Sequence, residues 1–143
     1  MIRYVVDASV AIKWFFQTDE DHLELAIALL RANRDGEVVF FQPPHFIAEV
    51  AAVLARKKPN EAQEDLSDLL NLDLQWVENS RVYATACDLA IRLNHHLFDT
   101  LYHAVALHAP DATLITADRR YFDKARPIGQ ILWLGDLSLS DPP

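Results

Sequence analysis

The sequence has few of the residues that build several common kinds of site. Its three glycines, Gly36, Gly129 and Gly135, fit neither a dinucleotide-binding nor a P-loop fingerprint. The single cysteine, Cys87, cannot form an internal disulfide, which favours a reducing compartment. The six histidines show no HExxH pattern, and one cysteine cannot make a paired-cysteine zinc motif. Dinucleotide, P-loop nucleotide and zinc sites are therefore not expected.

Positive charge is also scarce. The chain has 13 Lys and Arg against 21 Asp and Glu, a formal net charge of −8. This balance argues against loose, charge-driven binding to nucleic acid, which needs a basic surface. Much of the positive charge is concentrated in two short clusters, 56–58 and Arg119-Arg120-Lys124-Arg126.

Long hydrophobic runs are missing as well. The apolar N-terminal stretch is interrupted by Arg3, Asp7 and Lys13, so it suits neither a signal peptide nor a membrane span. We expect a cytoplasmic protein without membrane contact. With 143 residues, 51% of them hydrophobic, the chain is long enough for one domain with a substantial core. We predict that this domain covers residues 1–135, followed by a flexible tail over residues 136–143.

Short β-branched stretches alternate with helix-like stretches along the chain. Strands are predicted at 2–6, 38–41, 74–77, 113–116 and 131–134, and helices at 10–16, 22–33, 45–56, 61–70, 82–94, 100–109 and 118–125. This alternation predicts an α/β fold with a parallel sheet covered on both faces. In such open sheets, ligands bind just beyond the carboxyl ends of the strands.

Four acidic residues interrupt the predicted core. Asp7 and Asp118 each follow a strand, Asp99 directly precedes a mostly apolar helix, and Glu49 is the one acid in PPHFIAEVAAVLA. Taken singly, the aspartates are plausible helix N-caps and Glu49 belongs to a solvent-exposed stripe. If the four converge, their mutual repulsion calls for a divalent cation. An all-oxygen site suits Mg²⁺ or Mn²⁺, which commonly serve phosphate chemistry.

The segments VVDASVAIKWF, the helix around Glu49, FDTLYHAVA and LITADRRYF occur in this order. Together they resemble the PIN-domain nucleases, above all the VapC-type toxins of bacterial type II toxin–antitoxin pairs. The likeness extends from Ile2 to about Leu134. It implies a three-layer α/β/α sandwich with a short central parallel sheet. It also implies an endoribonuclease that depends on Mg²⁺ or Mn²⁺, forms a homodimer and is held inactive by a cognate antitoxin.

The resemblance further implies roles for individual residues. The acidic quartet of metal ligands and catalytic residues corresponds to Asp7, Glu49, Asp99 and Asp118, and two hydroxyls near the substrate correspond to Ser9 and Thr116. The third motif reads Phe98-Asp99-Thr100 where relatives commonly have Tyr-Asp-Ala. Because all four acids are present, this departure concerns substrate contacts more than catalysis.

Two further surfaces are predicted to bind partners. Arg119 and Arg120, just beyond Asp118, are expected to hold the RNA backbone on either side of the cut. Trp14 and Phe15 lie in a run more apolar than a short surface helix needs. We predict that they line a groove for an apolar antitoxin segment; the alternative is ordinary core packing. Core packing is the preferred interpretation for Tyr102, and a structural role for His103.

Other functions remain open. A receiver-like phospho-acceptor domain also has an acidic Mg²⁺ pocket at strand ends, but it needs adjacent acids after the first strand, where this chain has Ala8 and Ser9. A phosphatase with two aspartates separated by one residue is disfavoured by Ser9 for a similar reason. A PIN-like binding module without catalysis is the third alternative, and the complete acidic quartet argues against it.

Overall fold

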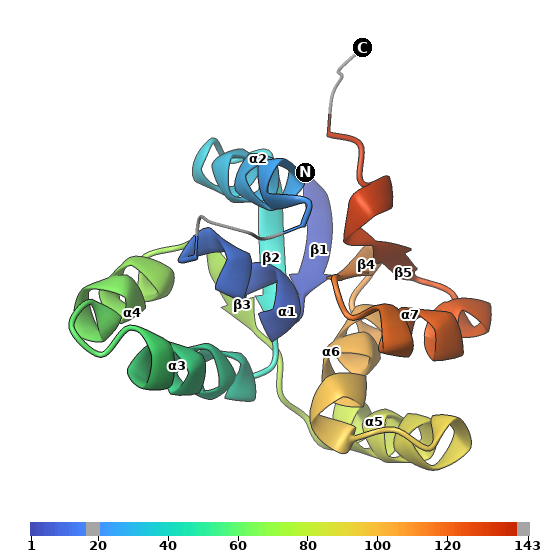
Figure 1. Cartoon of the computed structure of the whole chain (residues 1–143). Coiled ribbons are helices and arrows are strands. Elements are labelled where there is room, and N and C mark those ends of the chain that lie inside the picture. The colour runs from blue at the N-terminus through green and yellow to red at the C-terminus, as the bar shows by residue number, and fades with distance from the viewer. Residues whose placement is uncertain (17–20, 140–143) are drawn as a thin grey trace.

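The computed structural model describes residues 1–16 and 21–139. Its centre is a five-stranded, fully parallel sheet in the order β3-β2-β1-β4-β5 (Figure 1). The strands are β1 (Ile2–Val6), β2 (Val38–Gln42), β3 (Leu74–Trp76), β4 (Ala112–Thr116) and β5 (Ile131–Trp133). The predicted parallel sheet is therefore confirmed, and all five predicted strands are present.

Seven α-helices surround the sheet within the described residues. They are α1 (Ala8–Ala11), α2 (Leu23–Arg34), α3 (His45–Lys57), α4 (Ala62–Leu70), α5 (Ser80–Leu93), α6 (Leu97–His108) and α7 (Arg119–Ala125). Helix α2 packs against β2, whereas α6 contacts β1, β2 and β4 and carries α5 on its outer side (Figure 1). Right-handed crossovers put the connections leading to β2 and to β4 on opposite faces. The result is the predicted three-layer α/β/α sandwich.

The strand order creates a crevice between β1 and β4. The chain leaves β1 toward β2 on one side and leaves β4 toward β5 on the other, so the order reverses between these two central strands. In open parallel sheets such a switch point is where ligands bind. The buried Gln42 reinforces this end of the sheet, because its side-chain amide donates to the Val6 carbonyl at 2.7 Å and accepts from the Val6 N–H at 2.9 Å. Asp7 follows at once.

The core extends to both ends of the predicted domain. Trp14 is only 4% exposed, stacks on Phe40 with 5.7 Å between ring centroids, and donates its indole N–H to the Ala26 carbonyl. At the other end, Leu137 is buried and Leu139 packs on the core, so the described part of the predicted tail is attached to the domain. Residues 140–143 of that tail lie outside the described residues. Across 1–16 and 21–139, no helix has the length and apolar character needed to span a membrane.

Candidate metal and catalytic site

Asp7 is held at the carboxyl end of β1 by hydroxyl groups. It precedes α1, but its side chain makes no capping hydrogen bond, so the N-cap explanation is wrong for this residue. Instead, Ser9 donates to one carboxylate oxygen and Thr116 donates to the other, the latter at 2.5 Å. With 9% of its surface exposed, Asp7 sits at the edge of the core in a fixed orientation.

Both of these hydroxyls donate to Asp7 and also accept a backbone hydrogen bond. Ser9 Oγ also accepts from the Ala117 N–H, and Thr116 Oγ1 accepts from the Asp118 N–H, each at 3.0 Å. Thr116 has no exposed surface. Thr116 was expected to contact substrate; in this structure its buried hydroxyl orients Asp7. The half-buried Ser9 serves Asp7 in the same way.

The other two aspartates reach the crevice from the starts of α6 and α7. Asp118 is the N-cap of α7, and its Oδ1 accepts from the Tyr121 N–H at 3.1 Å, which leaves its second oxygen for other contacts. Asp99 lies inside the first turn of α6, which begins at Leu97, so the N-cap explanation is wrong for it. Asp99 Oδ2 is instead 2.8 Å from His95 Nε2. Ligand atoms of His95, Asp99 and Asp118 lie within 4.8 Å of one another.

Electrostatics links Asp7 to these acids. The pKa of Asp7 is raised to about 7; burial is the largest cause and the charges of Asp99 and Asp118 add to the rise, whereas the hydrogen bonds from Ser9 and Thr116 oppose it. The sequence suggested repulsion among the carboxylates; for the pKa of Asp7, burial is the larger cause in the structure. A buried carboxylate beside two others gains more from a nearby cation than an exposed one does.

Glu49 approaches the site from α3 and is fixed by different partners. It accepts a 2.5 Å hydrogen bond from the hydroxyl of Tyr102, and His45 Nε2 lies 3.6 Å from the same carboxylate oxygen. The pKa of Tyr102 is raised first by burial and then by the charge of Glu49, with smaller effects of Asp7 and Asp99. Glu49 thus faces the aspartates across Tyr102 but does not belong to the tight group around Asp99.

Two histidines contribute in different ways. His103 is buried, with one ring nitrogen 2.8 Å from the Tyr121 hydroxyl and the other 2.8 Å from the Gly129 carbonyl. The prediction of a structural histidine is confirmed for His103. His95 was missed as a site residue, because the segment before α6 looked like a plain connection. The available signal was its spacing of four residues from Asp99, one helical turn.

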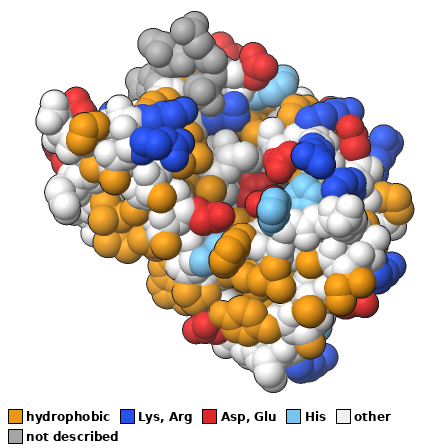
Figure 2. Space-filling view, turned by 60° about the horizontal axis from the view of Figure 1, so that its bottom comes forward, with side chains coloured by type: hydrophobic (Ala, Val, Ile, Leu, Met, Phe, Trp, Pro, Cys, Tyr) orange, Lys and Arg blue, Asp and Glu red, His pale blue; other side chains and the backbone are white. Residues whose placement is uncertain are grey.

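The basic residues after Asp118 do not all face the site. Arg119 folds away over aromatic rings, with its guanidinium 5.0 Å from the Trp133 ring centroid, and it pairs with Asp123 at 3.3 Å. Arg120 instead helps to line a cavity of about 300 Å³ together with Asn94, His95, His96 and Lys124. Figure 2 shows acidic and histidine side chains gathered near the middle of one face, with Lys and Arg side chains on both sides.

The family of the chain is shown by a match to one family model. The family model described as PIN domain matches residues 4–127. The chain belongs to the PIN domain family. A search among curated proteins returned no match.

Solved structures share this PIN fold at low sequence identity. VapBC2 from Rickettsia felis, bound to a DNA fragment from its promoter, has 18% identity and a TM-score of 0.62, over 92% of this chain and 97% of the other. PAE2754 from Pyrobaculum aerophilum has 18% identity and a TM-score of 0.62, over 94% and 92%. VapC20 from Mycobacterium tuberculosis, described as a sarcin–ricin loop cleaving toxin, has 14% identity and a TM-score of 0.61, over 80% and 87%. These likenesses show the fold of this PIN domain.

Proposed function

We propose that this PIN domain is an endoribonuclease that depends on Mg²⁺ or Mn²⁺ and acts as a VapC-type toxin. The observation that carries the proposal is that ligand atoms of Asp99 and Asp118 lie within 4.8 Å of each other, with their charges acting on Asp7 at the switch point between β1 and β4. Carboxylate oxygens are the ligands that Mg²⁺ and Mn²⁺ prefer. The description of the similarly folded VapC20 as a sarcin–ricin loop cleaving toxin supports RNA as the substrate class.

The acidic residues have two roles in this proposal: the three aspartates hold a cation and Glu49 positions water. A bound divalent cation supplies a water of lowered pKa and neutralises charge on the phosphate. Asp7, Asp99 and Asp118 would hold the cation. The hydroxyls of Ser9 and Thr116, which donate to Asp7, keep its carboxylate in one orientation. Glu49 has one oxygen fixed by Tyr102, which leaves the other free to position the attacking water.

The substrate is held by positive charge next to the acids. Arg120 lines a cavity beside the acidic group, which suits a phosphate next to the scissile one. Arg119 stacks on Trp133 and Phe122 and is a weaker candidate for this contact. The chain as a whole is acidic, so the cation and these local charges, rather than the overall charge, attract RNA.

The first test is metal-dependent cleavage. Purified protein incubated with total RNA is expected to cut at discrete positions in Mg²⁺ or Mn²⁺, to stop in EDTA, and to resume when excess metal is restored. Mapping of the cut ends identifies the target. Undiminished cleavage in EDTA would contradict the metal requirement. Incorporation of phosphate from a small phosphodonor, without RNA cleavage, would instead favour the receiver-like alternative.

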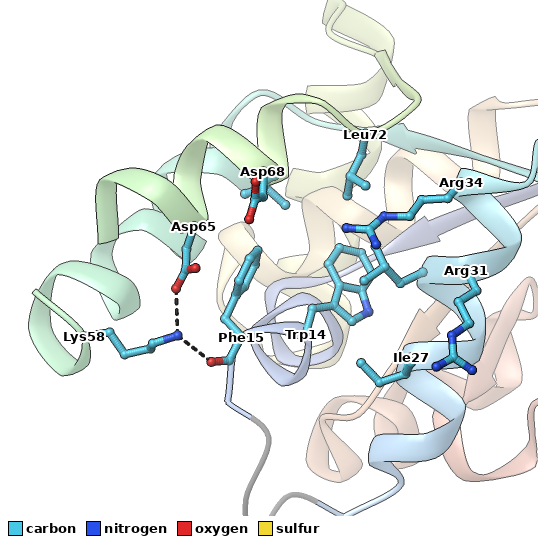
Figure 3. Close-up of a pocket in the computed structure, with 11 residues that line it drawn as sticks. Trp14, Phe15, Ile27, Arg31, Arg34, Lys58, Asp65, Asp68 and Leu72 are labelled. Carbon is cyan, nitrogen blue, oxygen red and sulfur yellow. Dashed lines mark hydrogen bonds and ion pairs between the residues drawn. The ribbon is translucent and has the colours of Figure 1, made fainter. Parts of the chain in front are cut away.

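The proposed antitoxin site is a cavity beside η1 (Ile12–Trp14). A cavity of about 570 Å³ is lined by Phe15 directly after η1, by α2 residues that include Ile27, and by α4 residues together with Leu72 just beyond that helix (Figure 3). Charges of both signs border it, and the Lys58 ammonium donates to Asp65 at 2.8 Å and to the Phe15 carbonyl at 2.9 Å. An amphipathic antitoxin segment suits this mixture of apolar floor and charged rim.

Of the two residues predicted to bind the antitoxin, Phe15 is the informative one. Trp14 is almost completely buried between β2 and α2, so its truncation tests the core rather than the groove. Phe15 is half-buried at the cavity wall. We expect Phe15→Ala to weaken binding of the cognate antitoxin by at least about tenfold, the size typical of an interface anchor.

The matched control for this measurement is Tyr83→Ala, which also removes an aromatic side chain, in this case an exposed one on α5. Titration calorimetry with the co-expressed antitoxin should show unchanged affinity for this control. Unchanged affinity in a folded Phe15→Ala protein would contradict the assignment of the groove. Homodimerisation and a cytoplasmic location, which the family resemblance and the composition suggest, stay predictions.

A further inference from the structure

Lys124 contacts the side chain of His95, which in turn contacts Asp99. The His95 side chain is 6% exposed, and its Nε2 lies 2.8 Å from Asp99 Oδ2. Its Nδ1 lies 3.2 Å from the Nζ of Lys124, which also donates to the Asn94 carbonyl at 2.8 Å. The ring of Tyr121 packs edge-on against the imidazole, 4.8 Å between centroids. Both nitrogens of His95 therefore have a defined neighbour, and the ring has little room to turn.

Asp99 and Lys124 together favour the ring hydrogen of His95 on Nε2, and Lys124 is the neighbour that disfavours the other tautomer. An ammonium group has three N–H donors and no acceptor, so the nitrogen facing it must offer a lone pair. Nδ1 is then the acceptor, and the ring hydrogen lies on Nε2, where it points at Asp99. A histidine binds a cation only through a nitrogen lone pair. In this tautomer Nε2 cannot coordinate, although it lies close to Asp99 and Asp118.

We propose that Lys124 keeps the acidic cluster an all-oxygen site by holding His95 as a hydrogen-bond donor to Asp99. His95 is then a positioning residue that orients the Asp99 carboxylate, and Lys124 determines metal selectivity. Carboxylate and water ligands suit Mg²⁺ and Mn²⁺, whereas an added imidazole shifts preference toward Zn²⁺ and its neighbours. The proposal rests on the metal site of the proposed function and adds what selects the ion.

Pulsed electron paramagnetic resonance of bound Mn²⁺ tests this directly, because it detects a directly coordinated ¹⁴N nucleus. The wild-type protein is expected to bind Mn²⁺ with no such nitrogen. A coordinated imidazole nitrogen in the wild type would overturn the proposal. If no Mn²⁺ binds at millimolar concentration, the proposed function fails as well, which distinguishes that outcome from failure of the inference alone.

Substitution of His95 tests whether this residue orients the Asp99 carboxylate for metal binding. We expect His95→Leu to weaken Mn²⁺ binding by about 10- to 100-fold, the usual cost of losing a group that orients a ligand. His95→Gln, whose amide keeps a donor near Asp99, is expected to recover most of this affinity. His108→Leu, at the other end of α6, is the matched control and should bind Mn²⁺ like the wild type. Wild-type affinity in a folded His95→Leu protein would overturn the proposal.

Substitution of Lys124 tests selectivity. Lys124→Met removes the donor that faces Nδ1. Nδ1 can then carry the ring hydrogen when a cation binds, which makes the lone pair of Nε2 available to that cation. The ratio of Mn²⁺ to Zn²⁺ dissociation constants, measured by calorimetry, is expected to shift toward Zn²⁺ by at least about tenfold. The double variant His95→Leu/Lys124→Met should lose this shift. An unchanged ratio in Lys124→Met, or a shift that persists in the double variant, would overturn the role of the pair.

Discussion

Asp118→Asn is expected to lower the rate of RNA cleavage by about a thousandfold or more, which corresponds to about 4 kcal/mol of transition-state stabilisation. The substitution removes one negative charge from the proposed metal site. It leaves the helix intact, because asparagine is as good an N-cap as aspartate and can still accept from the Tyr121 N–H. The variant therefore separates the two roles that Asp118 combines. Initial cleavage rates at saturating Mn²⁺, compared with melting temperatures, give the answer.

The matched control is Asp123→Asn, five residues further along in α7. Asp123 is exposed and pairs only at the surface with Arg119, so its loss should change neither rate nor fold. Asp99→Asn is expected to be as inactive as Asp118→Asn, since Asp99 carries the other carboxylate of the tight group. A folded Asp118→Asn protein that cuts RNA at the wild-type rate would reduce Asp118 to a helix cap and remove the assigned site.

Asp7→Asn is expected to stabilise the metal-free protein near pH 8 by as much as about 4 kcal/mol. The reason is the pKa of Asp7, which burial raises from an ordinary 3.8 to about 7. Each pKa unit is worth about 1.4 kcal/mol, so ionising this buried carboxylate costs the folded state several kcal/mol. Asparagine avoids this cost, and its amide can still make hydrogen bonds with the hydroxyls of Ser9 and Thr116.

The pH dependence has a definite sign. Between pH 4 and 7 the folded protein holds a proton on Asp7 that the unfolded chain has released. The free energy of unfolding of the metal-free wild type therefore contains a contribution that falls as pH rises through this window. Asp7→Asn lacks that contribution, so the two curves should meet near pH 4, separate as pH rises to about 7 and keep a constant separation above it. Parallel curves of denaturant stability against pH would contradict the raised pKa.

Metal binding should offset the free-energy cost of ionising the buried Asp7 carboxylate. Mg²⁺ or Mn²⁺ binds the native cluster and is expected to raise the melting temperature of the wild type near pH 8, with a smaller rise near pH 5 where protons compete. Asp7→Asn should show a reduced metal-induced rise because it has lost one ligand charge. The absence of any metal-induced rise in the wild type would mean that the three aspartates do not bind these ions.

The sequence by itself determined the architecture and the positions of the acids. Short apolar stretches alternating with helix-like ones predict a parallel α/β sheet, because such strands are buried under helices on both faces. Asp7 and Asp118 follow strands that the structure puts side by side, and parallel strands end at the same edge. Local pattern alone was sufficient here, since both inferences depend only on spacing along the chain.

Only the tertiary structure decided which groups surround those acids. Asp7 and Thr116, which share a hydrogen bond, are 109 positions apart, and Lys124 reaches His95 from 29 positions away. Trp14 lines the proposed groove but is only 4% exposed, and the guanidinium of Arg119 lies over the ring of Trp133. Hydrogen-bond direction and burial depend on distances across the fold, which spacing along the chain does not contain. The positions of the acids along the chain are thus a property of the sequence, whereas the pKa of Asp7 and the tautomer of His95 are properties of the folded protein.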